Sequence, residues 1–341
     1  MKRNFLLILI GCVLLAAVPD VLKAQIDDRP QRKLAQTGFK FLNLPLNARA
    51  AAMSDAVTSL HSGAEAMFYN TAAMAWMEKT TSVSVGMVQW IADINYNYGS
   101  IAFRPARGRF GVFGASFLAV DYGDLQRTVL ADTDERYIDL GTFSPGAYGI
   151  GIGYANAITE RFSVGGNVKY VNQDLGQSIV NIVDDDYVRE DNQTGVLAFD
   201  FGVMYHVGFE SLNFALSIRN FSEEIQFVQE SFQLPLTFRI GLSMNVMHLM
   251  ENPSENHIVL VSIDAERPRD YYEQLKIGTE YIFMNRIAFR GGYIFPSDEQ
   301  GISLGIGLRQ PLGSTDFAFD YAYSDLGIFS SVHRFSFNFA F

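Results

Sequence analysis

The sequence predicts an all-β protein, a 14-stranded antiparallel transmembrane β-barrel with a short helical N-terminal hatch. Segments of about ten residues alternate apolar and polar side chains, and the connections between them alternate in length. The chain also ends on a strand, RFSFNFAF. Its apolar face would need lipid, and a strand in lipid needs both edges paired, so the barrel must close. That face carries Phe335, Phe337, Phe339 and Phe341.

We expect fourteen strands from Thr80 onward, with lengths near the roughly 9 to 11 residues that a tilted strand needs to cross a bilayer. They cover residues 80–89, 94–104, 109–121, 146–158, 161–172, 194–207, 211–221, 233–247, 256–266, 271–283, 286–295, 301–310, 315–324 and 331–341.

Connections between the expected strands are mostly short on one side and long on the other. The second, fourth, sixth, tenth and twelfth are tight turns, whereas the third and fifth are loops of about twenty residues, Tyr122 to Ser144 and Gln173 to Gln193. This asymmetry is typical of outer-membrane barrels. The eighth connection, His248 to Glu255, is long on the short side. It is either a misplaced boundary or a periplasmic feature.

Charged residues fall on the faces predicted to point into the barrel. In the twelfth and thirteenth strands, apolar and aromatic side chains share one side and small or charged ones the other. We expect the inward charges to pair across neighbouring strands, Glu280 with Arg290, and Arg309 with Asp316 or Asp320 and then Arg334. This ladder either fills and rigidifies the lumen or lines a solute path.

The first residues predict the compartment. A basic start, an apolar run and a small residue at Ala24 read as a secretory signal peptide over residues 1–24. Residues 25–79 would form an N-terminal periplasmic segment and hatch, and residues 80–341 the outer-membrane barrel. Cleavage would remove Cys12, the only cysteine, and take the formal net charge from −11 to −13.

No motif in the sequence points to catalysis or a cofactor. Glycine at every second position from Gly149 to Gly153 fits a strand rather than a phosphate-binding loop. Acidic groups at Asp132, Asp134 and Asp139 and at residues 184–186 fit solvated loops better than calcium sites. We therefore expect no enzyme activity, no cofactor and no metal, and an acidic chain without basic clusters is a poor nucleic-acid binder.

The segment before the barrel has a different pattern. Apolar residues from Leu46 to Leu60 recur at helical spacing and predict a short amphipathic helix. A second apolar stretch, Ala64 to Met77, would fill the lumen or line a hydrophobic path through it. The residues of that possible path are Met67, Phe68, Met74 and Trp76.

Three motifs in this segment resemble the N-terminal region of the PorV/PorQ family. They are Thr37 to Leu42, Asn47 to Met53 and Asn70 to Ala75. The sequence departs from the family where Ser54 and Asp55 replace glycines and where Thr71 replaces the proline of an Asn-Pro-Ala motif. The hatch residues that carry the resemblance are Asn47, Arg49, Met53, Asn70, Ala72 and Ala73.

The resemblance implies a fold and a function. Members of that family look like fourteen-stranded barrels with a hatch, and they are similar to the FadL fatty-acid channels. It implies an outer-membrane accessory protein of type IX secretion that binds secreted cargo and docks on the translocon, with the two long loops and the barrel rim as the contact surface. The alternative is a FadL-like channel for hydrophobic solutes such as fatty acids, and a structural barrel without a transport role is a third reading. The expected partners are outer-membrane lipid, the translocon and cargo proteins, and under the channel alternative a hydrophobic small molecule.

Overall fold

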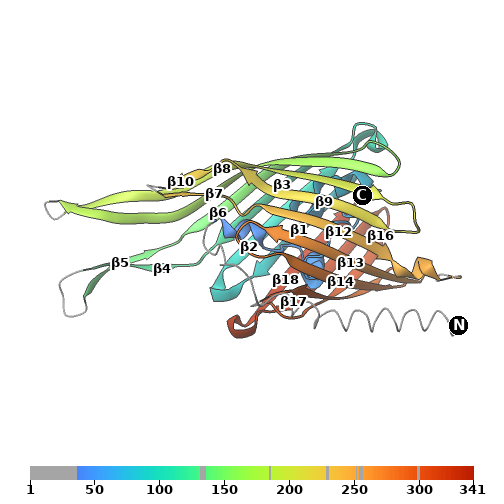
Figure 1. Cartoon of the computed structure of the whole chain (residues 1–341). Helices are drawn as coiled ribbons and strands as arrows, with labels where there is room; N and C mark the ends of the chain where they lie inside the picture. Colours follow the sequence, from blue (N-terminus) through green and yellow to red (C-terminus); the bar gives the residue numbers. More distant parts are fainter. Residues whose placement is uncertain are drawn as a thin grey trace.

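Strands of the described chain close into one antiparallel barrel (Figure 1). The structure, a computed structural model, describes residues 37–130, 136–183, 186–227, 230–250, 252, 256–297 and 300–341. Within these ranges the barrel has the predicted fourteen strands, which confirms the predicted fold class. They are β1 (Thr81–Gln89), β2 (Asn95–Phe103), β3 (Val112–Asp121), β6 (Gly146–Ala157), β7 (Phe162–Val183), β8 (Asp186–His206), β9 (Asn213–Ser222), β12 (Thr237–Asn245), β13 (His257–Pro268), β14 (Gln274–Phe283), β15 (Ile287–Phe295), β16 (Ser303–Leu312), β17 (Thr315–Asp325) and β18 (Ser331–Ala340).

The last strand closes the barrel against the first. β18 pairs with β17 on one side and with β1 on the other, from Ser82 opposite Ala340 to Gln89 opposite His333. This pairing satisfies the backbone groups at both ends of the sheet, as lipid requires. Phe337 points outward and is 39% exposed, whereas Arg334 on the opposite face is 2% exposed. The aromatic ending of the chain is thus the outer face of the closing strand.

The two ends of the barrel differ. One end, here called the turn end, has the short connections and the C-terminus, and the other, the hairpin end, has the long ones (Figure 1). The eighth connection, at the turn end, contains a short 3₁₀ helix, η6 (Val246–Leu249), and residues 251 and 253–255 of it lie outside the described residues.

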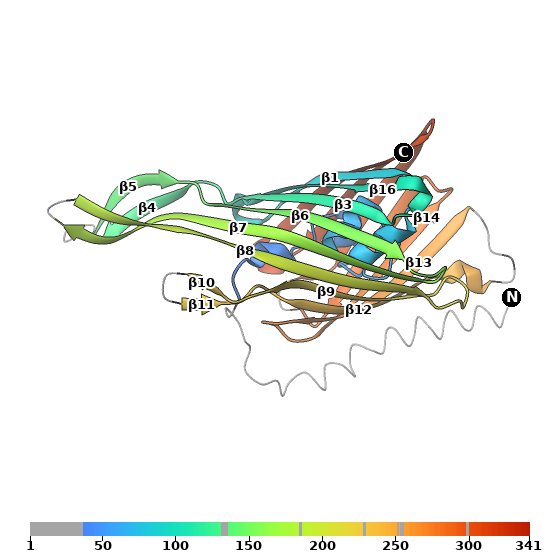
Figure 2. The ribbon, with the colours of Figure 1, turned by 90° about the horizontal axis from the view of Figure 1, so that it is seen from above.

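Both expected long loops contain hairpins, so their prediction as plain loops was wrong. β7 and β8 pair from Asp174 opposite Gln193 out to Val183 opposite Asp186, beyond their barrel neighbours. Figures 1 and 2 show this extension and a second hairpin, β4 (Leu125–Leu130) with β5 (Tyr137–Phe143), projecting in the same direction. A third, β10 (Ile225–Phe227) with β11 (Glu230–Phe232), lies at the same end. Backbone pairing forms these hairpins beyond the barrel, where no regularly alternating lipid face is needed, which is why the hydropathy pattern missed them.

The segment from Thr37 to Thr80, called the hatch from here on, runs through the lumen. It begins at the hairpin end, where Thr37 bridges Gln233, and it leaves at the turn end, where Lys79 pairs with Asp316. Residues 1–36, and with them the predicted signal peptide, lie outside the described residues. Within the described ranges, no helix has the length and apolar character needed to cross a membrane.

The predicted amphipathic helix from Leu46 to Leu60 was wrong in extent. The only α-helix of the described hatch is α2 (Ala48–Ala52). It ends there because Ser54 and Asp55 take left-handed backbone angles, with φ of 51° and 67°. The rest of the hatch folds as 3₁₀ turns, η1 (Lys40–Asn43), η2 (Ala64–Phe68) and η3 (Thr71–Trp76).

We predict that Phe337→Arg destabilises the barrel by about 2–4 kcal/mol, because it places a cation on the lipid face near the middle of β18. Leu312→Arg is the matched control, since Leu312 is equally outward but adjoins a turn. Its cost is about 0–1 kcal/mol. Guanidinium titration of protein folded into lipid vesicles measures both, and equal losses would contradict the depth assigned to Phe337.

Candidate functional site

The hatch is fixed in the lumen by hydrogen bonds to the barrel wall. Asn47 caps α2, since its side chain accepts from the N–H groups of Arg49 and Ala50 at 2.8 and 3.3 Å. The N–H of Ala48 donates to the Ser336 hydroxyl of β18 at 2.7 Å. The closing strand therefore also holds the start of the hatch helix.

A second anchor lies at the other hatch motif. The Asn70 amide donates to the backbone carbonyls of Thr58 and Val203 at 2.9 and 3.2 Å, and its oxygen accepts from the N–H of Ala72 at 3.2 Å. Ala73 and Ala72 are buried. Thus one buried amide joins two turns of the hatch to β8.

Two barrel glycines leave room for the turn that follows α2. A Cβ on Gly278 would lie 2.6 Å from the carbonyl oxygen of Met53, and one on Gly292 would lie 2.4 Å from the carbonyl carbon of Met53. Backbone cannot yield as a flexible side chain can, so these sites on β14 and β15 need glycine. Met53 itself is fully buried there.

A buried ion-pair network, called the Glu280 cluster, ties α2 to the wall. Arg49 forms a two-point pair with Glu280, with nitrogen–oxygen distances of 2.7 and 3.1 Å. Arg290 donates to the same carboxylate at 2.6 Å and to Asp320 at 2.7 Å. The Glu280 side chain is 0% exposed, and among the described residues its charge is compensated by these cations and by Arg309 at 3.3 Å.

The predicted charge ladder differs from this network in three places. Arg309 pairs with Glu280 rather than with Asp316 or Asp320. Asp316 lies beside the β16–β17 turn, 55% exposed, and pairs with Lys79 at 3.1 Å. Among the described residues Arg334 has no carboxylate within ion-pair distance. Its guanidinium donates to the carbonyl of Pro45 and the hydroxyl of Ser324 and lies 5.6 Å from the centre of the Trp90 ring.

The ladder departs from its prediction because the hatch supplies a partner that strand pairing does not show. Arg49 of the hatch lies 231 residues before Glu280 in the sequence and shares its carboxylate with the arginines of the wall. Register places Asp316 opposite Pro311, close to the turn, where water screens its charge. Of the predicted pairs, only Glu280 with Arg290, which lie opposite each other on β14 and β15, follows directly from neighbouring strands.

A second network, called the Asp55 cluster, is not among the pairs predicted from the sequence. Asp55 of the hatch accepts from Arg239 at 2.5 Å and Lys276 at 3.3 Å, both through its Oδ2 atom. Glu266 accepts from the same two cations, from Arg239 at 3.1 Å. The sequence does contain a signal for this network, because Asp55 lies in an apolar stretch and a buried carboxylate needs a cationic or hydrogen-bonding partner. Arg239 also alternates with the outward Phe238 and Ile240 on β12.

The charge state of Asp55 follows from its neighbours. Burial alone would raise the pKa of its carboxyl, but Arg239 and Lys276 outweigh burial and hold the pKa below its ordinary value. Asp55 is therefore ionised. Its second oxygen, Oδ1, accepts no hydrogen bond from any described group.

The residues expected to line a hydrophobic path contact the barrel wall or pack within the hatch. Met67 and Met74 are buried beside Gly114 and Gly153, at 2.5 to 3.0 Å from where a Cβ on these glycines would lie. The Trp76 indole N–H donates to Ser163 at 2.9 Å. Phe68 meets the edge of Tyr98 at 5.4 Å, and only a cavity of about 30 Å³ adjoins Met67 and Phe68.

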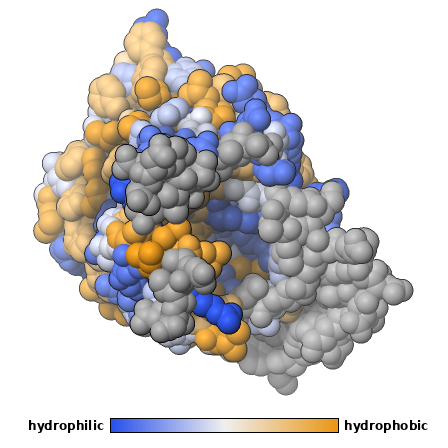
Figure 3. Space-filling model, turned by 90° about the vertical axis from the view of Figure 1, so that its left-hand side faces the viewer, coloured by the Kyte–Doolittle hydropathy of each residue, from blue (hydrophilic) through white to orange (hydrophobic). Residues whose placement is uncertain are grey.

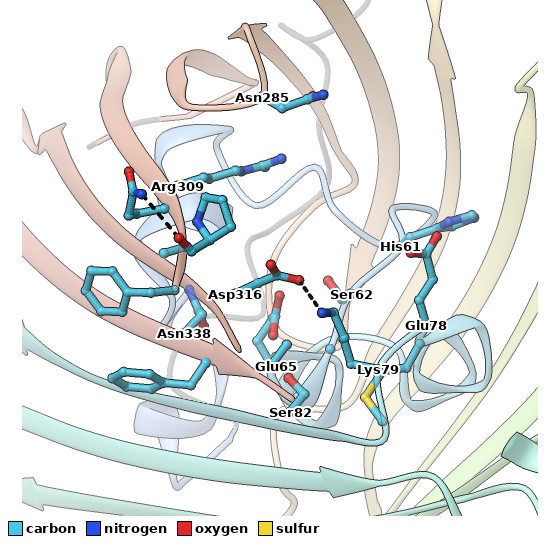
Figure 4. Close-up of a pocket in the computed structure, with 18 of the residues that line it drawn as sticks. His61, Ser62, Glu65, Glu78, Lys79, Ser82, Asn285, Arg309, Asp316 and Asn338 are labelled. Carbon is cyan, nitrogen blue, oxygen red and sulfur yellow. Dashed lines mark hydrogen bonds and ion pairs between the residues drawn. The ribbon is translucent and has the colours of Figure 1, made fainter. Parts of the chain in front are cut away.

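Two larger cavities lie at opposite ends of the hatch. The one at the turn end has about 520 Å³ and is lined by His61, Glu65, Lys79, Arg309 and Asp316, among others (Figure 4). His61 stacks on His206, and burial, with His206 and Arg49 nearby, lowers its pKa to about 4, so the ring is neutral.

The other cavity, called the mouth cavity, lies at the hairpin end and has about 460 Å³. Figure 3 looks onto this end and shows a central recess with hydrophilic residues on its walls. The described hatch, with its two ion-pair clusters, separates the mouth cavity from the cavity at the turn end.

Fold and lumen together define an outer-membrane barrel whose fold is similar to that of FadL-type barrels, with the described hatch inside its lumen. Residues 146–339, more than half of the sequence, match the family described as type IX secretion system membrane protein PorP/SprF, and the chain belongs to this family. The family name PorV/PorQ is not confirmed, but the type IX secretion system and the FadL-like fold are. A search among curated proteins found no match.

Solved structures share the fold at low sequence identity. The toluene transporter TbuX of Ralstonia pickettii has a TM-score of 0.57 and 14% identity, over 87% of this chain and 97% of its own. The toluene transporter TodX of Pseudomonas putida has a TM-score of 0.56 and 13% identity, over 91% and 98%. A FadL homologue of Pseudomonas aeruginosa has a TM-score of 0.53 and 10% identity, over 87% of this chain and 98% of its own. The protein is an outer-membrane barrel, and short turns in such barrels face the periplasm.

We predict that Glu280→Ala destabilises the protein by about 3–5 kcal/mol, because it leaves buried arginines without their carboxylate. Asp316→Ala is the control, since the pair of Asp316 with Lys79 is exposed and is worth at most about 1 kcal/mol. Denaturant titration in detergent gives both free energies of unfolding. Similar values for the two variants would show that the Glu280 cluster does not hold the hatch.

A neighbouring pair of glycines tests hatch packing. Gly292→Ala pushes a methyl group into the backbone of Met53 and should cost about 1–3 kcal/mol and raise hydrogen exchange in residues 46–56. Gly291→Ala should change neither, because a Cβ there meets its nearest atom, Leu304 Cδ2, at 3.7 Å. Hydrogen exchange by mass spectrometry distinguishes them. Unchanged exchange in Gly292→Ala would mean that the hatch is not packed against β15.

Proposed function

We propose that this protein is a type IX secretion accessory barrel that binds secreted cargo at its hairpin end and docks on the translocon. The observation that carries the proposal is the set of hairpins that project beyond the barrel (Figure 2). Membership in a type IX secretion family supports the same role.

The hairpins offer a surface suited to a protein partner. Large apolar side chains are exposed on the hairpins, which project beyond the barrel. Leu130 is the most exposed of them, at 89%. Exposed apolar residues gathered on one projecting element favour protein contact. The hairpins also have a rigid base, because Phe143 lies against Gly176 and Arg127 stacks on Phe143 at 4.9 Å. The exposed apolar residues are Leu125, Leu130, Tyr137, Ile138 and Leu175.

Unpaired strand edges add a second means of contact. β7 beyond Asp174 and β8 before Ala198 pair with each other but not with the barrel strands beside them. An extended segment of a partner could add to such an edge through main-chain hydrogen bonds. The rim formed by β6 and β9 next to these hairpins would be the adjoining docking surface.

The lumen favours this role over a hydrophobic channel. The described hatch fills the space between the two end cavities, and ionised side chains cross it in two clusters. The side chains of the expected path are engaged in packing. A solute would have to break buried ion pairs to pass, which costs several kcal/mol.

We predict that replacing residues 125–143 by a short turn abolishes secretion of partner proteins while the barrel still reaches the outer membrane. The β4–β5 hairpin is a separate two-stranded sheet, so its removal leaves the barrel pairing intact. The control shortens the connection that contains η6 (Val246–Leu249), which lies at the turn end, away from the hairpins and the mouth cavity. Mass spectrometry of culture medium and of outer membranes measures both steps. Normal secretion by the hairpin variant would refute cargo binding there.

A further inference from the structure

The mouth cavity has the features of a binding site that the hairpins alone do not explain. It is bordered by the connections β1–β2, β13–β14, β15–β16 and β17–β18, on the half of the rim away from the β7–β8 hairpin. The apolar part of its wall includes Trp90, Ile91, Leu326 and Phe329, of which Phe329 is 48% exposed. A partner held by the hairpins would lie across this opening.

The floor of the cavity carries an ionised acceptor. Asp55 lines the cavity and is 2% exposed. Both of its cationic neighbours, Arg239 and Lys276, bond to Oδ2, and Oδ1 accepts no hydrogen bond from the described residues. An ionised oxygen buried to this degree costs free energy unless a donor reaches it.

A cationic donor suits the unbonded oxygen of Asp55. The carboxylates of Asp55, Glu266 and Asp270 are balanced by Lys40 and Lys276 on the lining and by Arg239, which bonds to Asp55 and Glu266, but Oδ1 of Asp55 has no donor among the described residues. Apolar walls above a carboxylate fit a side chain with an apolar stem and a charged tip, which describes lysine and arginine. Hydrogen bonds between ions are also about twice as strong as neutral ones.

The hairpin end is acidic. Of the charged side chains that the structure describes in residues 122–144, 173–193 and 222–236, eight are acidic and three are basic. Such a surface attracts a basic segment over about a Debye length and repels an acidic one. Long-range attraction and the local acceptor thus select the same chemistry.

We propose that the mouth cavity binds a lysine or arginine side chain from an extended basic segment of the secreted partner, with the cation bonded to Asp55 and its stem against Phe329 and Trp90. This rests on the proposed cargo-binding function and names the chemistry of the partner. The hairpins bind the partner, and the mouth cavity binds one of its basic side chains.

The test measures binding of fluorescein-labelled pentalysine to the mature chain in detergent by fluorescence anisotropy, with labelled pentaglutamate as the probe control. We expect saturable binding of pentalysine alone. Asp55→Asn should weaken it about tenfold or more, because a charge-assisted hydrogen bond is lost. Phe329→Ala, a change at the exposed rim, should weaken it less, by about threefold.

The control is Asp316→Asn, the same chemical change at the turn end, which should leave binding unchanged. Thermal unfolding of each variant checks that the hatch remains folded, and Phe329→Ala keeps the test decisive if Asp55→Asn does not fold. Absence of saturable pentalysine binding overturns the proposal. So does binding that Phe329→Ala and Asp55→Asn leave intact, since the hairpin acids alone would then account for it.

The two proposals fail separately. Loss of secretion on hairpin removal together with no pentalysine site would leave cargo binding standing and remove only the mouth site. A pentalysine site that depends on Asp55, together with normal secretion by the hairpin variant, would keep the site and remove its assignment to secreted cargo.

Discussion

The whole structure depends on the requirement that no strand edge remain open in lipid. β18 meets this requirement by pairing with β1 along its length, and its outward phenylalanines give the closed surface its apolar face. Closure has a consequence inside, because a fourteen-stranded barrel encloses a lumen too wide for wall side chains alone to fill. The described hatch occupies that space, and its position determines which parts of the lumen remain open.

The hatch is held by charge as much as by packing. Arg49 and Asp55 lie on opposite sides of the turn after α2, and each reaches a carboxylate or cations of the wall. Buried pairs of this kind contribute little net stability, but removing one partner is costly, so they define position and orientation. Gly278 and Gly292 of the wall let the hatch backbone at Met53, between Arg49 and Asp55, approach closely. Opposite charges on the hatch thus fix its rotation within the barrel.

A lumen filled by the described hatch favours the two ends of the barrel as binding surfaces. The hairpins extend the sheet beyond the bilayer without depending on the barrel for their own pairing, and they carry apolar and acidic side chains. Beside them, the mouth cavity reaches down to the Asp55 cluster, so the residues that hold the hatch also form the floor of the proposed site. Binding at the mouth and retention of the hatch therefore share one carboxylate, and a ligand there would bear on both.

The sequence by itself determined the barrel, its strand number and the lipid-facing side of each strand, because period-two alternation and turn spacing are local and lipid imposes closure. Glu280 opposite Arg290 was predictable for the same reason, since they are on adjacent strands. Which wall residues the hatch contacts was decided by the tertiary structure. Arg49 meets Glu280, and Asp55 meets Arg239, across sequence separations of 231 and 184 residues. Neither periodicity nor propensity encodes how a short irregular segment rotates inside a closed wall, because that depends on packing and charge from many strands at once.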